Sequence, residues 1–395
     1  MADGSTKKKR NMSIKKSILI ISYSNLKNDP RVFRQIINLN KVGYQITAIG
    51  FSNPQVQGVN FIGVDKKESL LKKILFGVYL LLGFYEKYYW SQKKIKQSIE
   101  KVKGLEFDLI FANDLDTLPL AFKLKSELNC KILFDAHEYS PREHEDRLIW
   151  NLLFKKYTHN ILQNYKKYID FMFTVCKGIA DEYKKNYNLS PLVVTNATEY
   201  HEISPTIPKL KKIRMIHHGG SMKSRKIENM IMMMDEIDER YSLDLMLVNT
   251  DKTYHNYLIK LTNRRKNVTI IPPVEMHNIV NFISKYDIGL YILEPTNFNN
   301  GMALPNKIFE FIQARLAIAI GPSPEMKSLV EEYNLGVVSA DFDSKGLAIS
   351  LNNLTHQNII DFKKNSDEIA KKVNSEENVK IILKTVHQLI GNPVC

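Results

Sequence analysis

Residues 16–51 read KSILIISYSNLKNDPRVFRQIINLNKVGYQITAIGF. The β-branched apolar run Lys16–Ser24 predicts a strand, and Tyr44–Phe51 predicts a second one. Between them, Asp29 suits a helix N-cap and Pro30 suits the first helical position. A strand, a helix and a strand in so short a stretch form a βαβ unit, which predicts a parallel sheet.

Strand and helix patterns alternate along the rest of the chain. In the first half, further strands are expected at Asp108–Ala112, Lys131–Asp135, Phe171–Cys176 and Leu192–Thr195. In the second half, they are expected at Ile213–His218, Asp244–Val248, Val268–Ile271, Ile288–Leu293 and Leu316–Ile320. The fold class is therefore α/β, with two doubly wound, Rossmann-like domains that face a cleft.

The stretch Ser204–Lys212 is rich in proline and lysine and is interpreted as the linker between the domains. We expect an N-terminal domain at 12–203, a C-terminal domain at 213–372, and a last helix at 373–395 that packs back on the N-terminal domain. A length of 395 residues is sufficient for two such domains, each with its own core.

Composition narrows the class of protein. The chain is 44% apolar and 25% charged, which is typical of a globular protein, and its formal net charge is +14. That excess favours an anionic partner, but no nucleic-acid-binding motif is present, so we expect no nucleic acid. The three cysteines, Cys130, Cys176 and Cys395, form no CxxC pair, which favours a reducing cytoplasm over a disulfide framework or a zinc site.

Residues 1–11 are polar and end in a basic cluster. They are interpreted either as an artificial extension ahead of a native start at Met12 or as a short basic signal. No signal peptide is expected, because the apolar run Ile18–Ile21 is too short for one.

The segment Ile74–Tyr85, ILFGVYLLLGFY, interrupts the α/β pattern. It is shorter than the roughly 20 apolar residues that span a bilayer. Lysines flank it on both sides, and Tyr88, Tyr89 and Trp90 follow it, as in helices that lie in a membrane interface. Two interpretations stay open: an interfacial helix on an anionic membrane, or a buried helix with a solvated basic end.

Residues 304–315, LPNKIFEFIQAR, have the properties of a phosphate-binding helix start. A Leu-Pro turn leads into the helix, and the free amides of a helix N-terminus attract phosphate. Lys307 adds positive charge, and Glu310 lies on the same helix face because it follows three residues later. A carboxylate in that position accepts hydrogen bonds from a ribose diol, so the stretch predicts a nucleotide-sugar site.

Several motifs in order resemble a known family. They are Asn28–Val32, Phe134–Glu138, Val194–Ala197, the loop His218–Gly220 with Arg225, and Leu304–Glu310. Together they resemble a family 4 retaining glycosyltransferase of the GT-B fold, over roughly Ile18 to Val338. The resemblance implies a metal-independent, hexosyltransferase-type enzyme without a cofactor.

On the acceptor side, the resemblance assigns a catalytic role to His137, which contacts the donor sugar in the family. Its position just after an apolar strand places it at the carboxyl end of the sheet. Asp135 and Glu138 are candidates on the acceptor side; the alternative is that they are ordinary surface carboxylates.

On the donor side, Gly219 and Gly220 end a strand and let the backbone approach a phosphate. The family carries an Arg followed by a Lys; Arg225 fits the second position and the first is missing, so Lys307 is expected to supply that charge. Arg225 and Lys307 are therefore candidate catalytic and donor-binding residues.

Asn306 and Glu310 complete the expected donor site, but the chain departs from the family pattern nearby. Met302 stands where a first glutamate is usual, eight residues before Glu310. Glu294 cannot be assumed to replace it, so we expect the backbone around Asn300, Gly301 and Met302 to contact the donor.

Rival motifs are absent from the sequence: it has no Walker A loop, GxGxxG, GxSxG or zinc-ligand spacing. The predicted activity is transfer of a sugar, with retention, from a UDP- or GDP-sugar to a glycan or lipid-linked acceptor such as an envelope-polysaccharide precursor. The expected location is the cytoplasmic, inner face of the cell membrane. A nucleotide-sugar epimerase of the same fold and a non-catalytic membrane-associated scaffold are the alternatives.

Overall fold

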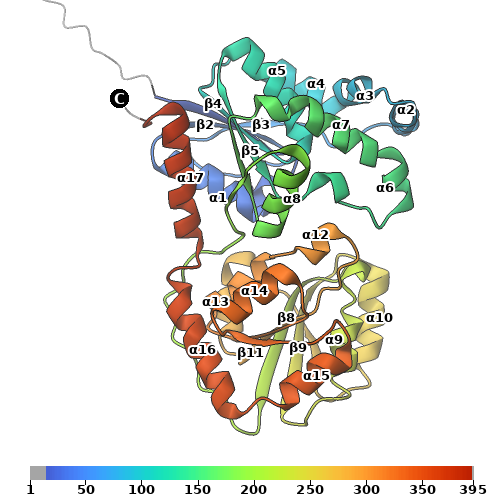
Figure 1. Ribbon diagram of the computed structural model, residues 1–395, viewed down its shortest axis with the longest axis vertical. Helices are drawn as coiled ribbons and strands as arrows, with labels where there is room; N and C mark the ends of the chain where they lie inside the picture. The colour runs from blue at the N-terminus through green and yellow to red at the C-terminus, as the bar shows by residue number, and fades with distance from the viewer. Residues whose placement is uncertain (1–14, 394–395) are drawn as a thin grey trace, which may run out of the picture. The chain divides into compact units, whose positions relative to one another are not determined.

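The computed structural model describes residues 15–393, so the basic segment 1–11 and the start predicted at Met12 lie outside the described residues. The chain divides into two compact units (Figure 1). Unit 1 comprises Met1–Ala136, Tyr157–Met172 and Ile382–Cys395. Unit 2 comprises His137–Lys156 and Phe173–Ile381.

Two parallel sheets form the framework of the chain. The first contains seven strands in the order β3-β2-β1-β4-β5-β6-β7, and the second contains six in the order β10-β9-β8-β11-β12-β13. Strand pairing is parallel throughout both, for example between β1 and β2 and between β8 and β9. The predicted α/β class with two doubly wound parallel sheets is confirmed.

The first sheet is built from β1 Ser17–Ile21, β2 Gln45–Gly50, β3 Asn60–Gly63, β4 Leu109–Asn113, β5 Lys131–Ala136, β6 Phe171–Thr174 and β7 Leu192–Val193. The second is built from β8 Ile213–Gly220, β9 Tyr241–Val248, β10 Val268–Ile271, β11 Ile288–Tyr291, β12 Ala317–Ile320 and β13 Gly336–Val338. Sequence patterns did not predict β3 and β13, because edge strands this short carry too few apolar residues to show a period.

The helices of the first half are α1 Pro30–Lys41, α2 Leu70–Leu81, α3 Tyr85–Ser91, α4 Lys93–Val102, α5 Leu118–Leu128, α6 Leu148–Leu153, α7 Lys155–Tyr165 and α8 Lys177–Tyr187. Those of the second half are α9 Glu228–Met233, α10 Lys252–Thr262, α11 Ile279–Ile283, α12 Phe298–Gly301, α13 Asn306–Gln313, α14 Pro324–Glu332, α15 Ser344–Asn352, α16 His356–Ala370 and α17 Ser375–Ile390.

Helix α1 shows how the opening stretch folds. Asp29 caps the helix by accepting a hydrogen bond from the Val32 amide at 3.2 Å, and Pro30 is its first residue. Val32, Ile36 and Leu39 are fully buried along one face, as are the apolar residues of β1. The local signals and the hydrophobic pattern therefore agree.

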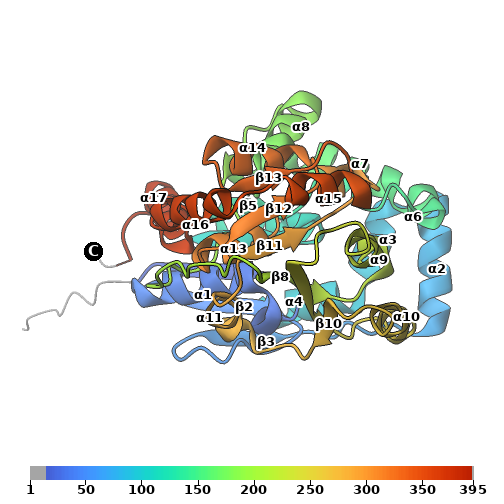
Figure 2. The ribbon, with the colours of Figure 1, turned by 90° about the horizontal axis from the view of Figure 1, so that it is seen from below.

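In unit 2, α13 packs against β11, β12 and α16 (Figure 2). Ile308, Phe311 and Ile312 on this helix are fully buried. Burial of these side chains fixes the helix start, Asn306, at the carboxyl ends of β11 and β8, where α/β sheets bind their ligands.

Helix α2, in unit 1, is unusually exposed for its composition, and it lies beside α3 in Figure 2. Leu70, Leu71 and Ile74 are 74%, 79% and 61% exposed, and only Phe76 and Leu80 are buried. The interpretation of this segment as a buried helix is therefore wrong. No helix within residues 15–393 has the length and hydropathy needed to cross a membrane.

A buried ion pair in unit 1 joins β5 to α1. Arg31 donates from Nε and Nη2 to the two carboxylate oxygens of Asp135, each at 2.7 Å, and Gln35 donates to the same carboxylate at 2.7 Å. Asp135 is 1% exposed. The expectation that Asp135 serves the acceptor needs correction, because its oxygens already hold the arginine and the glutamine inside the fold.

We expect Arg31→Ala to lower the free energy of unfolding by about 3–5 kcal/mol, because the Asp135 carboxylate would stay buried without its cation. The matched control is Lys16→Ala, which opens the half-exposed Lys16–Asp108 pair and should cost about 0–1 kcal/mol. Urea unfolding monitored by circular dichroism measures both. Equal losses in the two variants would contradict a structural role for the buried pair.

Candidate functional site

A cavity of about 520 Å³ opens in unit 2 at the carboxyl ends of β8 and β11. Its size falls in the usual range for small-molecule sites. Three groups of residues line it: the ends of the strands, the helix starts that follow them, and the chain after β5. They include His137, Glu138, Asn196, His218, Gly219, Gly220, Met222, Arg225, Tyr291, Asn299, Asn300, Met302, Asn306, Lys307 and Glu310.

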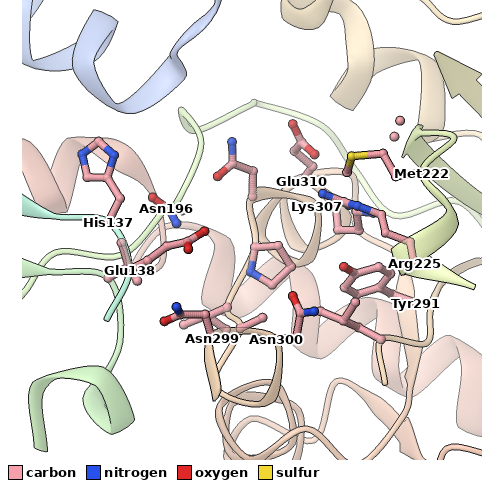
Figure 3. A pocket seen from close by; sticks show the side chains of 18 of the residues that line it. His137, Glu138, Asn196, Met222, Arg225, Tyr291, Asn299, Asn300, Lys307 and Glu310 are labelled. Carbon is pink, nitrogen blue, oxygen red and sulfur yellow. The ribbon is translucent and has the colours of Figure 1, made fainter. Parts of the chain in front are cut away.

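Lys307 is the most unusual of these residues. It is 5% exposed, and its Nζ has no hydrogen-bond partner among the described residues. The amine lies 4.0 Å from the centroid of the Tyr291 ring (Figure 3). Burial, and then the positive charge of Arg225, lower the pKa of Lys307 well below its usual value. A buried amine without an acceptor is costly, so the site is built for an anion that the fold does not supply.

The backbone of Gly219 comes close to this amine. Gly219 has φ +139°, and a Cβ added there would lie 3.2 Å from Lys307 Nζ and 3.9 Å from Arg225 Nη1. Only glycine combines that backbone conformation with that approach. Gly220 likewise lies close to Thr250, since an added Cβ would be 3.2 Å from its side chain.

Arg225 supplies the second cation of the cavity. It ends a short 3-10 helix, Lys223–Arg225, which is closed by Lys226 in the left-handed region at φ +45°. Among the described residues no carboxylate pairs with Arg225, whereas Lys226 forms an ion pair with Glu294. Lys223 and Lys226 do not line the cavity. Arg225 therefore gives one wall of the cavity a positive charge, and Lys307 adds an amine whose lowered pKa would rise if an anion were bound beside it.

The start of α13 adds backbone donors to the same wall. Pro305 precedes the helix and gives no side-chain cap, and the Asn306 and Lys307 amides have no acceptor among the described residues. Free amides at a helix N-terminus favour an anion, and the helix dipole acts in the same direction.

Glu310 lies one turn further along α13, next to His218. The distance from His218 Nε2 to Glu310 Oε2 is 3.3 Å, and both side chains are largely buried. Burial, with the charges of Lys307 and Arg225, lowers the pKa of His218 to about 3. His218 is therefore neutral at physiological pH and contacts Glu310 without cancelling its charge.

The two histidines before the glycines carry structural roles that sequence reasoning missed. His217 is fully buried, its Nδ1 lies 3.0 Å from the Leu290 carbonyl, and its ring stacks on Tyr291 with centroids 5.7 Å apart. The sequence shows only two adjacent histidines at the end of a strand, a pattern that does not predict these contacts. Within residues 15–393, no group of side chains has the make-up of a metal site.

His137 and Glu138 lie across the cavity from Lys307 and Arg225 (Figure 3). Hydrogen bonds from two other segments hold the backbone of Glu138 and Tyr139, next to His137. Asn299 accepts from the Tyr139 amide at 2.8 Å, and the Tyr183 hydroxyl donates to the Glu138 carbonyl at 2.9 Å. The segment that carries His137 is thus fixed to α12 and α8.

The short helix α12 does not offer the backbone groups that the sequence suggested. The amides of Asn300, Gly301 and Met302 already donate to Asn297 and Phe298 within this turn, at 2.8–3.0 Å. Gly301 does not line the cavity, whereas Asn300 and Met302 do. Backbone binding by α12 therefore needs correction, and the free amides belong to α13 instead.

Comparison with solved structures shows that the fold is shared. Sucrose-phosphate synthase from Thermosynechococcus elongatus is 13% identical, with a TM-score of 0.68 over 95% of this chain and 99% of that one. Anabaena HepE, in complex with UDP and glucose, is 12% identical, with a TM-score of 0.70 over 94% of this chain and 100% of that one.

A third similar structure is an α,α-trehalose-phosphate synthase (UDP-forming) from Burkholderia xenovorans in complex with glucose-6-phosphate. It is 9% identical, with a TM-score of 0.66 over 94% of this chain and 100% of that one. No protein-family model and no curated protein sequence matches this chain. At these identities the likeness defines the fold, which is that of GT-B glycosyltransferases.

Substitution of two buried lysines, Lys307 and Lys363, tests whether the Lys307 amine lacks a hydrogen-bond acceptor in the folded protein. Lys307→Met should raise the free energy of unfolding by about 1–3 kcal/mol at neutral pH, because it removes an unsatisfied buried group. Lys363→Met should lower it, because Lys363 is 1% exposed but donates to the Tyr286 carbonyl at 2.8 Å.

The sign of the pH dependence follows from the lowered pKa of Lys307. In the pH range between its folded and unfolded pKa values, the unfolded state binds more protons, so the wild type gains stability as pH rises. The advantage of Lys307→Met should therefore shrink as pH approaches the usual lysine pKa. Urea titrations at several pH values measure this, and a loss of stability in Lys307→Met equal to that in Lys363→Met would contradict the assignment.

Proposed function

We propose that this chain is a glycosyltransferase that uses a nucleotide-diphosphate sugar as donor and transfers the sugar with retention. The observation that carries the proposal is the Lys307 amine, buried beside Arg225 without a hydrogen-bond acceptor among the described residues. A diphosphate supplies the missing anion. As the leaving group of the reaction it also gains charge in the transition state, where preorganised cations contribute most.

The other walls accommodate the rest of such a donor. Glu310, held beside His218, accepts hydrogen bonds from a ribose diol, and the apolar side chains of Met222, Met276 and Ile279 leave room for a base. The sugar then faces His137 and Glu138 on the opposite wall. The structures with a shared fold support a nucleotide-sugar donor, since HepE is in complex with UDP and glucose and the trehalose-phosphate synthase is described as UDP-forming.

We propose for the two domains the same binding roles that the sequence predicts. The C-terminal domain, 213–372, holds the nucleotide, and the N-terminal domain, 12–203, binds a glycan or lipid-linked acceptor, with the last helix 373–395 returning to it. His137 contacts the donor sugar. In this proposal Arg225 and Lys307 stabilise the charge of the diphosphate, which is the role expected of them in a metal-independent enzyme.

Donor turnover tests the proposal. With labelled UDP- and GDP-sugars, we expect Lys307→Ala to lower kcat/KM by about 10²–10³-fold, because it removes a donor to the developing charge. Glu310→Gln should act mainly by raising KM, since a ribose contact is the same in ground and transition states. The control is Lys327→Ala on α14, which removes a half-exposed surface lysine.

Full activity in both Lys307→Ala and Glu310→Gln would refute the site. Product analysis separates the two alternative functions. An epimerase releases an isomer or free sugar without any acceptor, and a scaffold binds nucleotide without turnover.

We further propose that the protein works at an anionic membrane surface. Along α2 and the turn after it, Leu70, Leu71, Ile74, Leu81 and Leu82 are all more than half exposed. So extended an apolar surface is unusual on a protein that stays in water.

Lysines flank this surface: Lys66 and Lys67 precede α2, Lys72 and Lys73 lie in its first turns, and Lys87 follows on α3. An apolar face bordered by lysines matches helices that lie in the lipid headgroup region, where each lysine adds about 1 kcal/mol of attraction to anionic lipid. A lipid-linked acceptor and a location on the inner face of the cell membrane fit this surface.

Vesicle flotation tests the membrane proposal independently of activity. Wild type should float with phosphatidylglycerol-containing vesicles at low salt, and Leu71→Glu/Ile74→Glu should stay at the bottom of the gradient. The control is Ile349→Glu on α15, which changes an isolated apolar side chain that is 63% exposed. Flotation of the α2 variant to the same extent as wild type would contradict the proposal.

A further inference from the structure

Unit 2 contains a second cavity, of about 560 Å³, at the opposite edge of its sheet. It is lined by residues at the amino ends of the strands: Arg214 at the start of β8, Ser242 and Asp244 at the start of β9, Lys266 before β10, and Asp287 before β11. The donor cavity lies at the carboxyl ends of β8 and β11. The two cavities are therefore separated by the length of the strands.

The lining of this second cavity is strongly basic. It carries five cationic side chains, namely Lys209, Lys212, Arg214, Lys266 and Lys285, against two carboxylates. The excess is three positive charges. Such a concentration of like charge within one cavity is unfavourable unless an anion enters it.

The two carboxylates are already engaged by other groups. Asp244 accepts from the Tyr286 hydroxyl at 2.6 Å and lies 3.6 Å from Arg214. Asp287 is 5% exposed and accepts from the Arg214 amide at 2.8 Å. Neither is placed to neutralise the surrounding lysines.

The lysines, in contrast, have no carboxylate partner within residues 15–393. Lys209, Lys212 and Lys266 form no ion pair there, and Lys285 contacts only the rings of Phe282 and Tyr286, at 3.9 and 5.8 Å from their centroids. Unpaired ammonium groups around a concave surface are the donor set of a site for a multiply charged oxyanion.

We propose that this basic cavity is a second binding site, for a small ligand that carries two or more phosphate groups. Arg214 is the most constrained of the five cationic side chains. Its guanidinium lies over the Tyr286 ring, 4.3 Å from the ring centroid, and beside Asp244. Lys209, Lys212 and Lys266 are exposed, and they would contact the anion from the segment 204–212 and from the residues before β10. The cavity volume falls in the range of small-molecule sites and suits a sugar bisphosphate or an oligophosphate.

The site is independent of the proposed donor chemistry, and the test keeps the two apart. Tripolyphosphate binding is measured by calorimetry on the full chain with Arg225→Ala/Lys307→Ala, which removes both cations of the donor cavity. In this background we expect binding of one tripolyphosphate. Adding Lys209→Gln/Lys212→Gln/Lys266→Gln should weaken it by more than tenfold, or about 1.4 kcal/mol.

A charge-matched control excludes a general effect of net charge. Lys211→Gln/Lys252→Gln/Lys260→Gln removes three exposed lysines of the same unit that do not line the cavity, and it should change the affinity less than twofold. Equal weakening by the two triple variants, or no binding in the starting background, would overturn the proposal. Citrate in place of tripolyphosphate distinguishes a phosphate site from a general polyanion site: citrate binding of equal strength would overturn the phosphate assignment.

Discussion

The amine of Lys307 lies inside unit 2, 5% exposed, over the Tyr291 ring and without a hydrogen-bond acceptor among the described residues. The apolar face of α13 brings it there. Ile308, Phe311 and Ile312 are fully buried against the sheet, and a helix anchored by three such side chains fixes where its first turn points. Burial of each contributes about 1.5–3 kcal/mol, enough together to hold an unsatisfied amine in place. Burial of the apolar face of α13 thus offsets the unfavourable free energy of the unsatisfied Lys307 amine. A bound anion would supply the hydrogen-bond acceptor that this amine lacks.

The parallel sheet explains why the two basic cavities of unit 2 differ in construction. At the carboxyl ends of β8 and β11, short turns lead directly into helix starts, so the donor cavity has glycine backbone, free amides and buried cations. At the amino ends, the chain enters from the segment 204–212 and from loops, and most of the cationic side chains there are exposed lysines. Buried groups give orientation and specificity, whereas exposed lysines give charge with little geometric constraint.

Local signals along the chain predicted most of the fold. The first βαβ unit could be predicted from its sequence alone. Asp29 and Pro30 mark the start of the helix, and the apolar run after Lys16 marks the buried strand before it. The structure also brings Gly219, Gly220 and Lys307, which the sequence assigned to one donor site, to the lining of one cavity. What could not be predicted depends on tertiary packing. The Asp135 carboxylate is used by Arg31, a hundred residues away in sequence, and the α12 amides are used by their own turn.

The positions of the carboxylates in the donor cavity limit which of them could act at the transferred sugar. Two carboxylates line the donor cavity among the described residues, Glu310 and Glu138. Glu310 lies beside a neutral His218 on the wall that we propose binds the phosphates, and in that proposal it contacts the ribose. Met302 lies near Gly178, where an added Cβ would be 2.6 Å from its sulfur, and it offers the sugar an apolar surface. In the donor orientation that we propose, Glu138 next to His137 supplies the carboxylate on the wall that faces the sugar. The cationic side chains of the other wall would then stabilise the charge that develops on the leaving group.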